Sequence, residues 1–199
     1  PDIIFSCNYN LFIPPSILDS SKYGGLNFHG GILPYYRGCM SGVWSILNNE
    51  NESGVTLHYM DENLDTGDIV EIRKVKILPS DTAISLYEKV RILSYELFKE
   101  ILTKLPVLPR YKQDTKSVRY YDRKLPNNGI LNWNWTNSKI LRFIRAMYFP
   151  PFKPAEGIIH GKKIFIEKCV TVNNKNISPS LPGNILEENY DHIIIQTGN

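Results

Sequence analysis

The order in which apolar patterns follow one another is the feature that most constrains the fold of this chain. Apolar and polar residues alternate, as they do in half-buried strands, at 26–29, 54–60 and 69–77. A continuous apolar run at 3–5 precedes them and is typical of a strand buried on both faces of a parallel sheet. Farther on, apolar residues recur every three or four positions as far as Lys104, which predicts a long helix capped by Asp81. Strands alternating with helices predict an α/β domain rather than an all-β one.

The remaining elements are expected around this frame. Further helices are predicted at 15–18, 41–49 and 138–147. Later in the chain, short apolar runs separated by turn residues predict strands at 157–160, 163–172 and 192–196. A basic stretch punctuated by prolines at 106–121 suits a linker on the surface. We therefore expect a core in 1–105, a linker and a helix packed on the core in 106–155, and a small β subdomain in 156–199.

Bulk composition excludes several classes of protein. With 42% hydrophobic and 22% charged residues, the chain matches an ordinary globular protein, and no apolar run reaches the roughly 18–20 residues that cross a bilayer. The net charge of +3 permits an anionic substrate but falls short of a nucleic-acid-binding surface. Three widely separated cysteines form neither a disulfide framework nor a zinc motif, so a reducing cytoplasm is the expected compartment. Both ends of the chain read as cut, and we expect missing sequence mainly at the N-terminus.

Polar, chemically capable side chains gather on one face of the strand at 26–29. Because side chains alternate along a strand, Asn27 and His29 emerge together, opposite the apolar positions. A loop with glycines and a proline comes next, and a later acidic, turn-rich loop at 61–68 contains Asp65. Taken singly these features are weak, because strand-end polar residues usually meet solvent and aspartates are common in turns.

Three segments occur together and in order: Asn27-Phe-His-Gly-Gly-Ile-Leu-Pro-Tyr-Tyr-Arg-Gly38, Gly54-Val-Thr-Leu-His-Tyr-Met60 and Asp65-Thr-Gly-Asp-Ile69. In sequence and spacing they resemble the formyltransferase superfamily, whose members use 10-formyltetrahydrofolate and include glycinamide ribonucleotide, methionyl-tRNA and nucleotide-sugar formyltransferases. The resemblance covers about half of the chain and persists more weakly through Trp133 to Ala155. It implies a Rossmann-like core followed by a small β-rich subdomain.

The resemblance assigns catalytic roles to Asn27, His29 and Asp65. Attack of an amine on a formyl group builds negative charge on the formyl oxygen, which the Asn27 amide and a His29 imidazolium would stabilise as an oxyanion hole. Asp65 near His29 would raise the imidazole pKa and would accept, directly or through water, the proton that the amine loses. This chemistry requires no metal. The family often has a histidine at the position of His58, which we expect to be a packed strand residue rather than a catalytic one.

The resemblance also places the cofactor, 10-formyltetrahydrofolate, in a cleft between two loops. In the family this cleft lies between the loop that carries the aspartate and the segment after the preceding strand. Backbone groups of the first would read the edge of the pterin ring, and apolar side chains of the second would flank it. The predicted cofactor contacts are Asn10, Leu11, Phe12, Asp61 and Leu64. Taken one at a time, Leu11 and Phe12 are equally well explained as packing residues at the start of a helix.

The acceptor implied by the resemblance is the amine of a nucleotide-linked amino sugar. The glycine after His29 and the following Leu-Pro-Tyr-Tyr-Arg-Gly38 are similar to the sugar enzymes, whereas the purine enzyme has a proline after the histidine. Tyr35 would contact the sugar and Arg37 would pair with a phosphate; a tyrosine that fills the loop and an arginine that bridges loop carbonyls are the alternatives. Gly31 departs from the family, in which a serine is usual, so one hydroxyl that would position substrate is missing.

Two other functions stay open. The first is methionyl-tRNA formyltransferase, but lysines after Met147 are balanced by acidic residues, and a tRNA binder depends on neutralising phosphates. The second is a formyl-folate hydrolase or a non-catalytic folate-binding module, because relatives that hydrolyse formyl-folate keep the same three residues. The sequence predicts no membrane partner and leaves open whether two copies of the chain pair as a homodimer.

Overall fold

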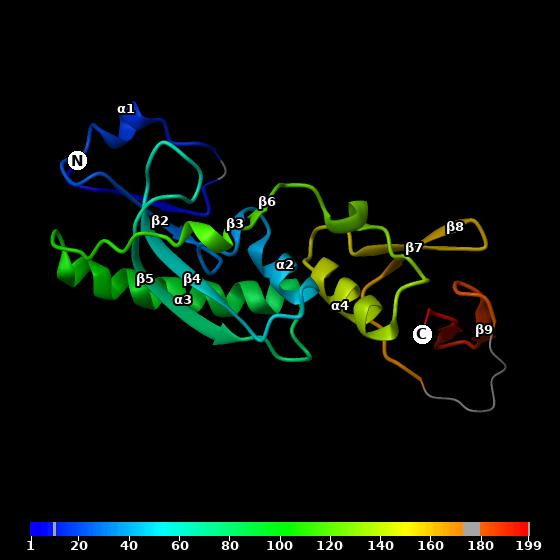
Figure 1. Cartoon of the computed structure of the whole chain (residues 1–199). Coiled ribbons are helices and arrows are strands. Elements are labelled where there is room, and N and C mark those ends of the chain that lie inside the picture. The colour runs from blue at the N-terminus through cyan, green and yellow to red at the C-terminus, as the bar shows by residue number, and fades with distance from the viewer. Residues whose placement is uncertain (10, 173–179, 199) are drawn as a thin grey trace.

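In the computed structural model, which describes residues 1–9, 11–172 and 180–198, a four-stranded sheet forms one end of an elongated molecule (Figure 1). Its strands are β1 (Ile4–Cys7), β2 (Gly25–His29), β4 (Glu52–Tyr59) and β5 (Ile69–Lys76). The helices are α1 (Pro15–Leu18), α2 (Ser41–Leu47), α3 (Ala83–Lys104) and α4 (Asn137–Met147), with short 3-10 helices at Thr115–Ser117 and Pro126–Gly129. The predicted α/β class is therefore confirmed.

The sheet is mixed rather than parallel. Its order is β1-β2-β4-β5, with β1 parallel to β2 and the other neighbouring pairs antiparallel. The prediction that the first strand is buried on both faces is wrong, because β1 lies at an edge of the described sheet and Ile4 and Phe5 are only half-buried. Between β1 and β4, β2 is buried along its length apart from half-buried Asn27.

Helix α3 packs its apolar face on the sheet (Figure 1). Its buried residues recur at helical spacing and are Ala83, Leu86, Val90, Leu97 and Ile101. Full burial of each large aliphatic side chain among them contributes roughly 1.5–3 kcal/mol. The predicted N-cap is wrong by one residue: Thr82 caps the helix and forms a capping box with Ser85. Asp81 instead accepts hydrogen bonds from the Leu78 N–H and the Lys89 ammonium group.

The segment between α3 and α4 crosses the sheet and returns to the loop that follows β2 (Figure 1). Tyr111 pairs with Ile69 at the start of β5 through backbone hydrogen bonds of 2.8 and 2.9 Å. Farther along, β6 (Tyr120–Tyr121) pairs in parallel with β3 (Arg37–Gly38). The stretch predicted as a linker is therefore joined to the core by these two backbone pairings.

Two small antiparallel sheets form the C-terminal part at the other end of the molecule (Figure 1). Their strands are β7 (Ala155–Ile159) with β8 (Lys162–Ile166), and β9 (Ile185–Glu188) with β10 (Ile193–Ile195). The strand predicted at 163–172 ends early, at Ile166, and β9 was not among the predicted strands. Trp133 lies against this part, and its indole N–H donates to the Ile158 carbonyl at 2.9 Å.

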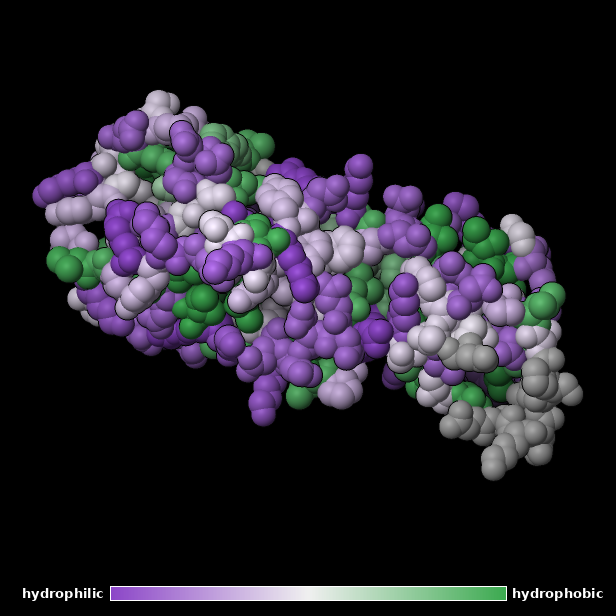
Figure 2. Space-filling model, viewed as in Figure 1, coloured by the Kyte–Doolittle hydropathy of each residue, from purple (hydrophilic) through white to green (hydrophobic). Residues whose placement is uncertain are grey.

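The surface carries mainly hydrophilic residues on the face in Figure 2, with apolar residues in small scattered patches over both ends. Among the described residues, no helix is long and apolar enough to span a membrane. The sheet, the loops that follow β2 and β4, and the segment that crosses the sheet meet in one region, so a site can be built from them.

Candidate active site

Antiparallel pairing of β2 with β4 brings four polar side chains onto one face of the sheet. The register sets Asn27 opposite His58 and His29 opposite Thr56. Residues that face each other across a strand pair share a side of the sheet. His29, Thr56 and His58 are buried and Asn27 is half-buried. Asn27 and His29 thus share a face, as the alternation along their strand predicted.

Asp65 completes this cluster from the loop between β4 and β5. Its carboxylate lies between two imidazoles, with Oδ2 3.5 Å from His29 Nδ1 and Oδ1 3.5 Å from His58 Nε2. The Gly38 N–H also donates to Oδ2 at 2.8 Å. The backbone of Asp65 has a φ of +57°, a left-handed conformation that aspartate tolerates better than most residues. The three predicted catalytic residues, Asn27, His29 and Asp65, therefore lie in one cluster.

Both ring nitrogens of His29 face protein groups. Nε2 lies 2.5 Å from the Tyr36 carbonyl oxygen, to which it must donate. In the neutral ring, Nδ1 is then unprotonated and faces Asp65. Burial lowers the pKa of His29 and outweighs the opposing effects of Asp65 and of the Tyr36 hydrogen bond. Asp65 thus acts to raise the pKa of His29, as predicted, but the predicted imidazolium is wrong, and His29 is neutral at neutral pH.

Asp65 is ionised although it is buried. Burial acts to raise its pKa, but the neighbouring His58 and His29 and the Gly38 N–H together lower the pKa below its usual value. An ionised carboxylate beside the unprotonated Nδ1 of His29 forms a proton-accepting pair. Within the described residues, no group of three or more His, Cys, Asp or Glu side chains could hold a metal ion.

His58 has a larger place in the cluster than its sequence alone indicated. Its side chain is buried, and Nδ1 donates to the Tyr59 carbonyl at 2.7 Å. Nε2 is then left to accept an N–H from the Asn27 amide at 3.1 Å. His58 is packed and hydrogen-bonded, as expected, but its partners are the predicted catalytic groups. The signal was present in the sequence, because antiparallel pairing of the two alternating segments sets His58 opposite Asn27.

Thr56 holds the loop that follows His29. Its hydroxyl donates to the Gly31 carbonyl at 2.6 Å and accepts from the Leu33 N–H at 3.1 Å. A side chain at Gly31 would place its Cβ 2.9 Å from His29 Nε2, closer than ordinary packing allows. The glycine that stands where the family usually has a serine thus leaves room for the observed position of the His29 ring.

One of the predicted cofactor contacts, Asp61, lines an open hollow of about 380 Å³. Its lining residues are Pro15, Leu18, Asp19, Ser21, Gly24, Met60, Asp61 and Glu62. Asp61 lines the hollow, and its carboxylate shapes the loop by accepting from the Asn63 N–H and the Thr66 hydroxyl. Leu11, Phe12 and Leu64 are exposed apolar side chains outside this lining, and Asn10 lies outside the described residues.

The two predicted acceptor contacts differ in their surroundings. Tyr35 is exposed. Arg37 is half-buried and donates from Nε and Nη2 to the side-chain oxygen of Gln113, at 3.1 and 2.7 Å. Arg37 is therefore engaged with a residue of the crossing segment for which the sequence predicted no role.

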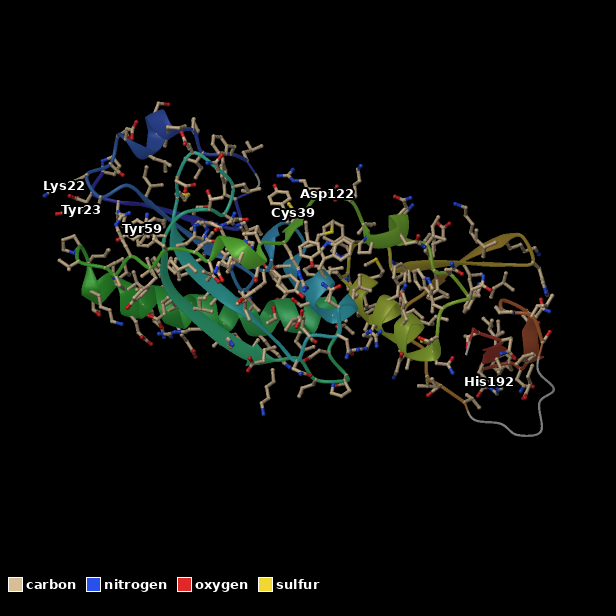
Figure 3. All side chains as sticks on the ribbon, viewed as in Figure 1. Lys22, Tyr23, Cys39, Tyr59, Asp122 and His192 are labelled. Carbon is tan, nitrogen blue, oxygen red and sulfur yellow. The ribbon has the colours of Figure 1, made fainter. Side chains whose placement is uncertain are left out.

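A stack of three aromatic rings lies beside the pairing of β3 with β6. Tyr121 stacks on Tyr36 at 5.4 Å between ring centroids and on Trp44 at 4.8 Å. Cys39 and Asp122, each one residue beyond these two strands, lie close together in Figure 3. The stack fixes the end of the loop that begins after His29, and so helps to set where the Gly38 N–H meets Asp65.

The fold is a mixed sheet with helices packed on it. The paired strands β2 and β4 and the loop after β4 bring together an amide, a neutral imidazole and an ionised carboxylate, which defines an α/β protein suited to acyl-group transfer. The chain belongs to the formyl transferase family. Residues 1–102 match the model of formyl transferase, and residues 125–199 match the model of the formyl transferase C-terminal domain. The superfamily predicted from the three motif segments is thus confirmed, together with the small β-rich C-terminal part.

Relatives of known sequence and structure include enzymes of two acceptor classes. GDP-perosamine N-formyltransferase of Brucella melitensis biotype 1 is 39% identical over 166 residues, which are 83% of this chain and 64% of the relative. Methionyl-tRNA formyltransferase of Geobacter metallireducens is 31% identical over 201 residues, 100% of this chain and 63% of the relative. A solved N-formyltransferase from Helicobacter canadensis, in complex with folinic acid and dTDP-3-aminofucose, has a TM-score of 0.76 at 29% identity, over 97% of this chain and 69% of that one. The chain spans less than two thirds of the length of these two sequence relatives.

Proposed function

We propose that this protein transfers a formyl group from 10-formyltetrahydrofolate to the amine of a nucleotide-linked amino sugar. The observation that carries the proposal is the cluster of Asn27, His29 and Asp65. The Asp65 carboxylate lies 3.5 Å from His29 and 3.5 Å from His58, and His58 joins it to the Asn27 amide. Membership in the formyl transferase family supports it, as do relatives described with GDP-perosamine and with dTDP-3-aminofucose.

In the proposed reaction the amine nitrogen attacks the formyl carbon, and negative charge develops on the formyl oxygen as the new C–N bond forms. Asn27 gives one amide hydrogen to His58 and has a second for the formyl oxygen. The attacking nitrogen loses its proton to Asp65, directly or through a water molecule. The bond between the formyl carbon and the folate nitrogen then breaks, and that nitrogen takes up a proton.

His29 reaches the formyl oxygen in this proposal only after it changes partners. In the structure, its Nε2–H is given to the Tyr36 carbonyl, so that bond must open before the imidazole can donate to a substrate. We expect a crystal structure with a formyl-folate analogue to show the His29 ring turned away from Tyr36. Retention of the Tyr36 bond beside a bound formyl group would limit His29 to accepting a proton with Asp65.

In this proposal, successive parts of the chain have different roles. Residues 1–105 would carry the transfer chemistry, 156–199 would form the β-rich subdomain, and 106–155 would tie these two parts together. The folate would bind beside the loop at 61–64, where Asp61 lines the hollow and Leu64 is exposed. Exposed apolar side chains at Leu11 and Phe12 would cover the flat pterin ring by burying apolar area.

The test is a comparison of acceptors. The purified protein is mixed with 10-formyltetrahydrofolate and with GDP-linked and dTDP-linked amino sugars, with methionyl-tRNA, or with no acceptor, and formylated product and formate are measured by mass. We expect a formylated sugar nucleotide and little formate in the absence of acceptor. Formylation of methionyl-tRNA alone would favour the second acceptor class that the Geobacter relative suggests. Formate released equally with and without acceptor would indicate a hydrolase.

A further inference from the structure

The side chain of Gln113 uses both ends of its amide in the described structure, and each end joins a different part of the candidate site. The amide nitrogen donates to the Asp65 carbonyl at 2.9 Å and to the Gly67 carbonyl at 2.8 Å. The amide oxygen accepts from Nε and Nη2 of Arg37 at 3.1 and 2.7 Å. Gln113 lies on the segment that crosses the sheet and is half-buried. One side chain thus links the loop after β4 to the loop after β2.

The turn at Asp65–Gly67, which Gln113 contacts, has a backbone conformation that neighbouring groups must hold in place. Asp65 has a left-handed backbone, which is sparsely populated for residues with a side chain and persists where the surroundings hold it. Gly67 lies so close to the Tyr59 backbone that a Cβ there would collide with the Tyr59 carbonyl. The two hydrogen bonds from Gln113 fix the carbonyls on either side of Thr66, so they hold the turn from which the Asp65 side chain projects.

The hydrogen bond from Gly38 to the Asp65 carboxylate also depends on Gln113. Oδ2 accepts the Gly38 N–H at 2.8 Å, and Gly38 directly follows Arg37 in β3. Because Gln113 binds the Arg37 side chain and the Asp65 backbone together, it sets the spacing between the donor at Gly38 and the acceptor at Asp65. A displacement of about 1 Å at a reacting group can cost on the order of 100-fold in rate.

We propose that Gln113 is a positioning residue that fixes the Asp65 carboxylate against His29 and His58 by clamping the loops after β2 and β4 to each other. The inference rests on the proposed formyl transfer for its kinetic consequence and on the hydrogen bonds alone for its structural one. It also gives Arg37 a partner inside the protein. That partner is a glutamine side chain, whereas the alternative to phosphate binding that the sequence left open was a bridge between loop carbonyls.

Two substitutions separate the donor end of the amide from the acceptor end. Gln113→Met removes both ends at similar length, whereas Gln113→Glu keeps an oxygen for Arg37 but has no N–H for Asp65 and Gly67. Lys112→Met is the matched control, because Lys112 is the neighbouring residue and its highly exposed side chain pairs with Asp68 at 3.0 Å. We expect kcat to fall about 10- to 100-fold in both Gln113 variants, with KM for the acceptor changed less than about 3-fold, and no change in Lys112→Met. A wild-type kcat in Gln113→Glu would overturn the proposal, since holding Arg37 would then be sufficient.

Hydrogen exchange supplies a readout that does not depend on activity. The Gly38 amide reports directly on the position of Asp65, and the Ile77 amide, bonded to the Asn51 carbonyl at 2.9 Å, reports on the sheet far from Gln113. We expect exchange at Gly38 to be faster in both Gln113 variants by about 10-fold or more, with Ile77 unchanged. This result in a protein that formylates no acceptor would support the clamp while the proposed function fails. Unchanged exchange at Gly38, or global unfolding of both variants, would contradict the clamp.

Discussion

The groups that each catalytic residue can offer to a substrate are those that are not already hydrogen-bonded within the protein. His58 occupies one hydrogen of the Asn27 amide, Tyr36 occupies Nε2 of His29, and Gly38 occupies one oxygen of Asp65. The groups left for a substrate are the second Asn27 hydrogen, the other Asp65 oxygen and the unprotonated His29 Nδ1. These are one donor for a developing oxyanion and two acceptors for a departing proton.

Removal of the donor or of the acceptor should therefore stop turnover with little effect on folding. We expect Asn27→Ala and Asp65→Ala each to lower kcat by at least about 100-fold, the typical effect of losing one oxyanion donor, and we expect the same loss for His29→Ala. His192→Ala is the control, because that histidine is exposed and pairs with Asp191 in the C-terminal part. Steady-state rates with melting temperatures measure both effects. Near-normal turnover in any of the three would remove that residue from the mechanism.

Burial of neutral His29 makes a prediction about acid stability. Its pKa is lowered in the folded state, mainly by burial, so the unfolded chain binds the extra proton as pH falls below the ordinary value of about 6.5. Stability is thus lost on acidification from about 6.5 downward, at most by about 1.4 kcal/mol per pH unit for one proton. Asp65, whose pKa is lowered although burial acts to raise it, contributes stability above about 3.9 and loses it only at lower pH.

The measurement is denaturant unfolding between pH 8 and 5 for the wild type and for His29→Gln, which keeps an amide donor for Tyr36. The other histidines are common to both proteins, including His192, whose pKa is raised chiefly by its hydrogen bond to Asp191 and whose contribution has the opposite sign. The difference between the two curves isolates His29. We expect the wild type to lose more stability than the variant over this range, and parallel curves would show that His29 takes no part.

At the scale of elements, the parts of the fold with strict periodicity were predictable and the rest were not. The alternation of β4 and the helical spacing of α3 located both elements to within a few residues. The pattern was misleading about burial in β4, however, because that strand is buried on both faces and not half-buried. The apolar pattern continues past Ile166, but Val170 and Val172 are exposed. The partner strand β7 begins at Ala155, which lies opposite Ile166, so residues after Ile166 have no partner in β7. A strand needs a partner, and the sequence pattern does not contain one. The role of Gln113 was not predicted for a related reason, because it depends on two loops that only the fold brings together.

Gly31 gives a prediction for the loop between β2 and β3. Its substitution by serine, the residue usual in the family, would put Cβ 2.8 Å from Ser41 Cβ and 2.9 Å from His29 Nε2. We expect Gly31→Ser to lower stability by about 1–3 kcal/mol, as overpacking does, and to shift the His29 ring resonances. Gly42→Ser is the matched control, because its Cβ would meet Leu86 at an ordinary 3.7 Å. Equal effects of the two substitutions on stability and on His29 would contradict the proposed crowding.

At the scale of the whole molecule, charge distribution bears on the choice between a sugar nucleotide and a tRNA. The net charge is +3, and in the C-terminal part Lys163 pairs with Glu156 at 2.9 Å, so one of its basic groups is already neutralised. Figure 2 shows hydrophilic residues spread over both ends of the molecule rather than gathered at one. A small acceptor with two phosphates needs few cations, whereas a tRNA gains much of its affinity from many phosphate contacts.

The salt dependence of kcat/KM therefore distinguishes the two acceptors. For a duplex nucleic acid the slope of log affinity against log salt is about −0.9 per neutralised phosphate, so a tRNA substrate making several contacts should lose orders of magnitude between 50 and 200 mM salt, on the order of 1,000-fold or more for six contacts. For a sugar nucleotide bound through its two phosphates we expect a loss of about 10-fold or less over the same range, because only exposed, screened charges are involved. Lys163→Gln should leave the sugar-nucleotide reaction unchanged, since that lysine lies far along the chain from the cluster and pairs with Glu156. A steep slope, together with turnover of methionyl-tRNA and of no amino-sugar nucleotide, would reverse the choice of acceptor. The proposed roles of Asn27, His29 and Asp65 would not change, because both acceptors present an amine to the same formyl carbon.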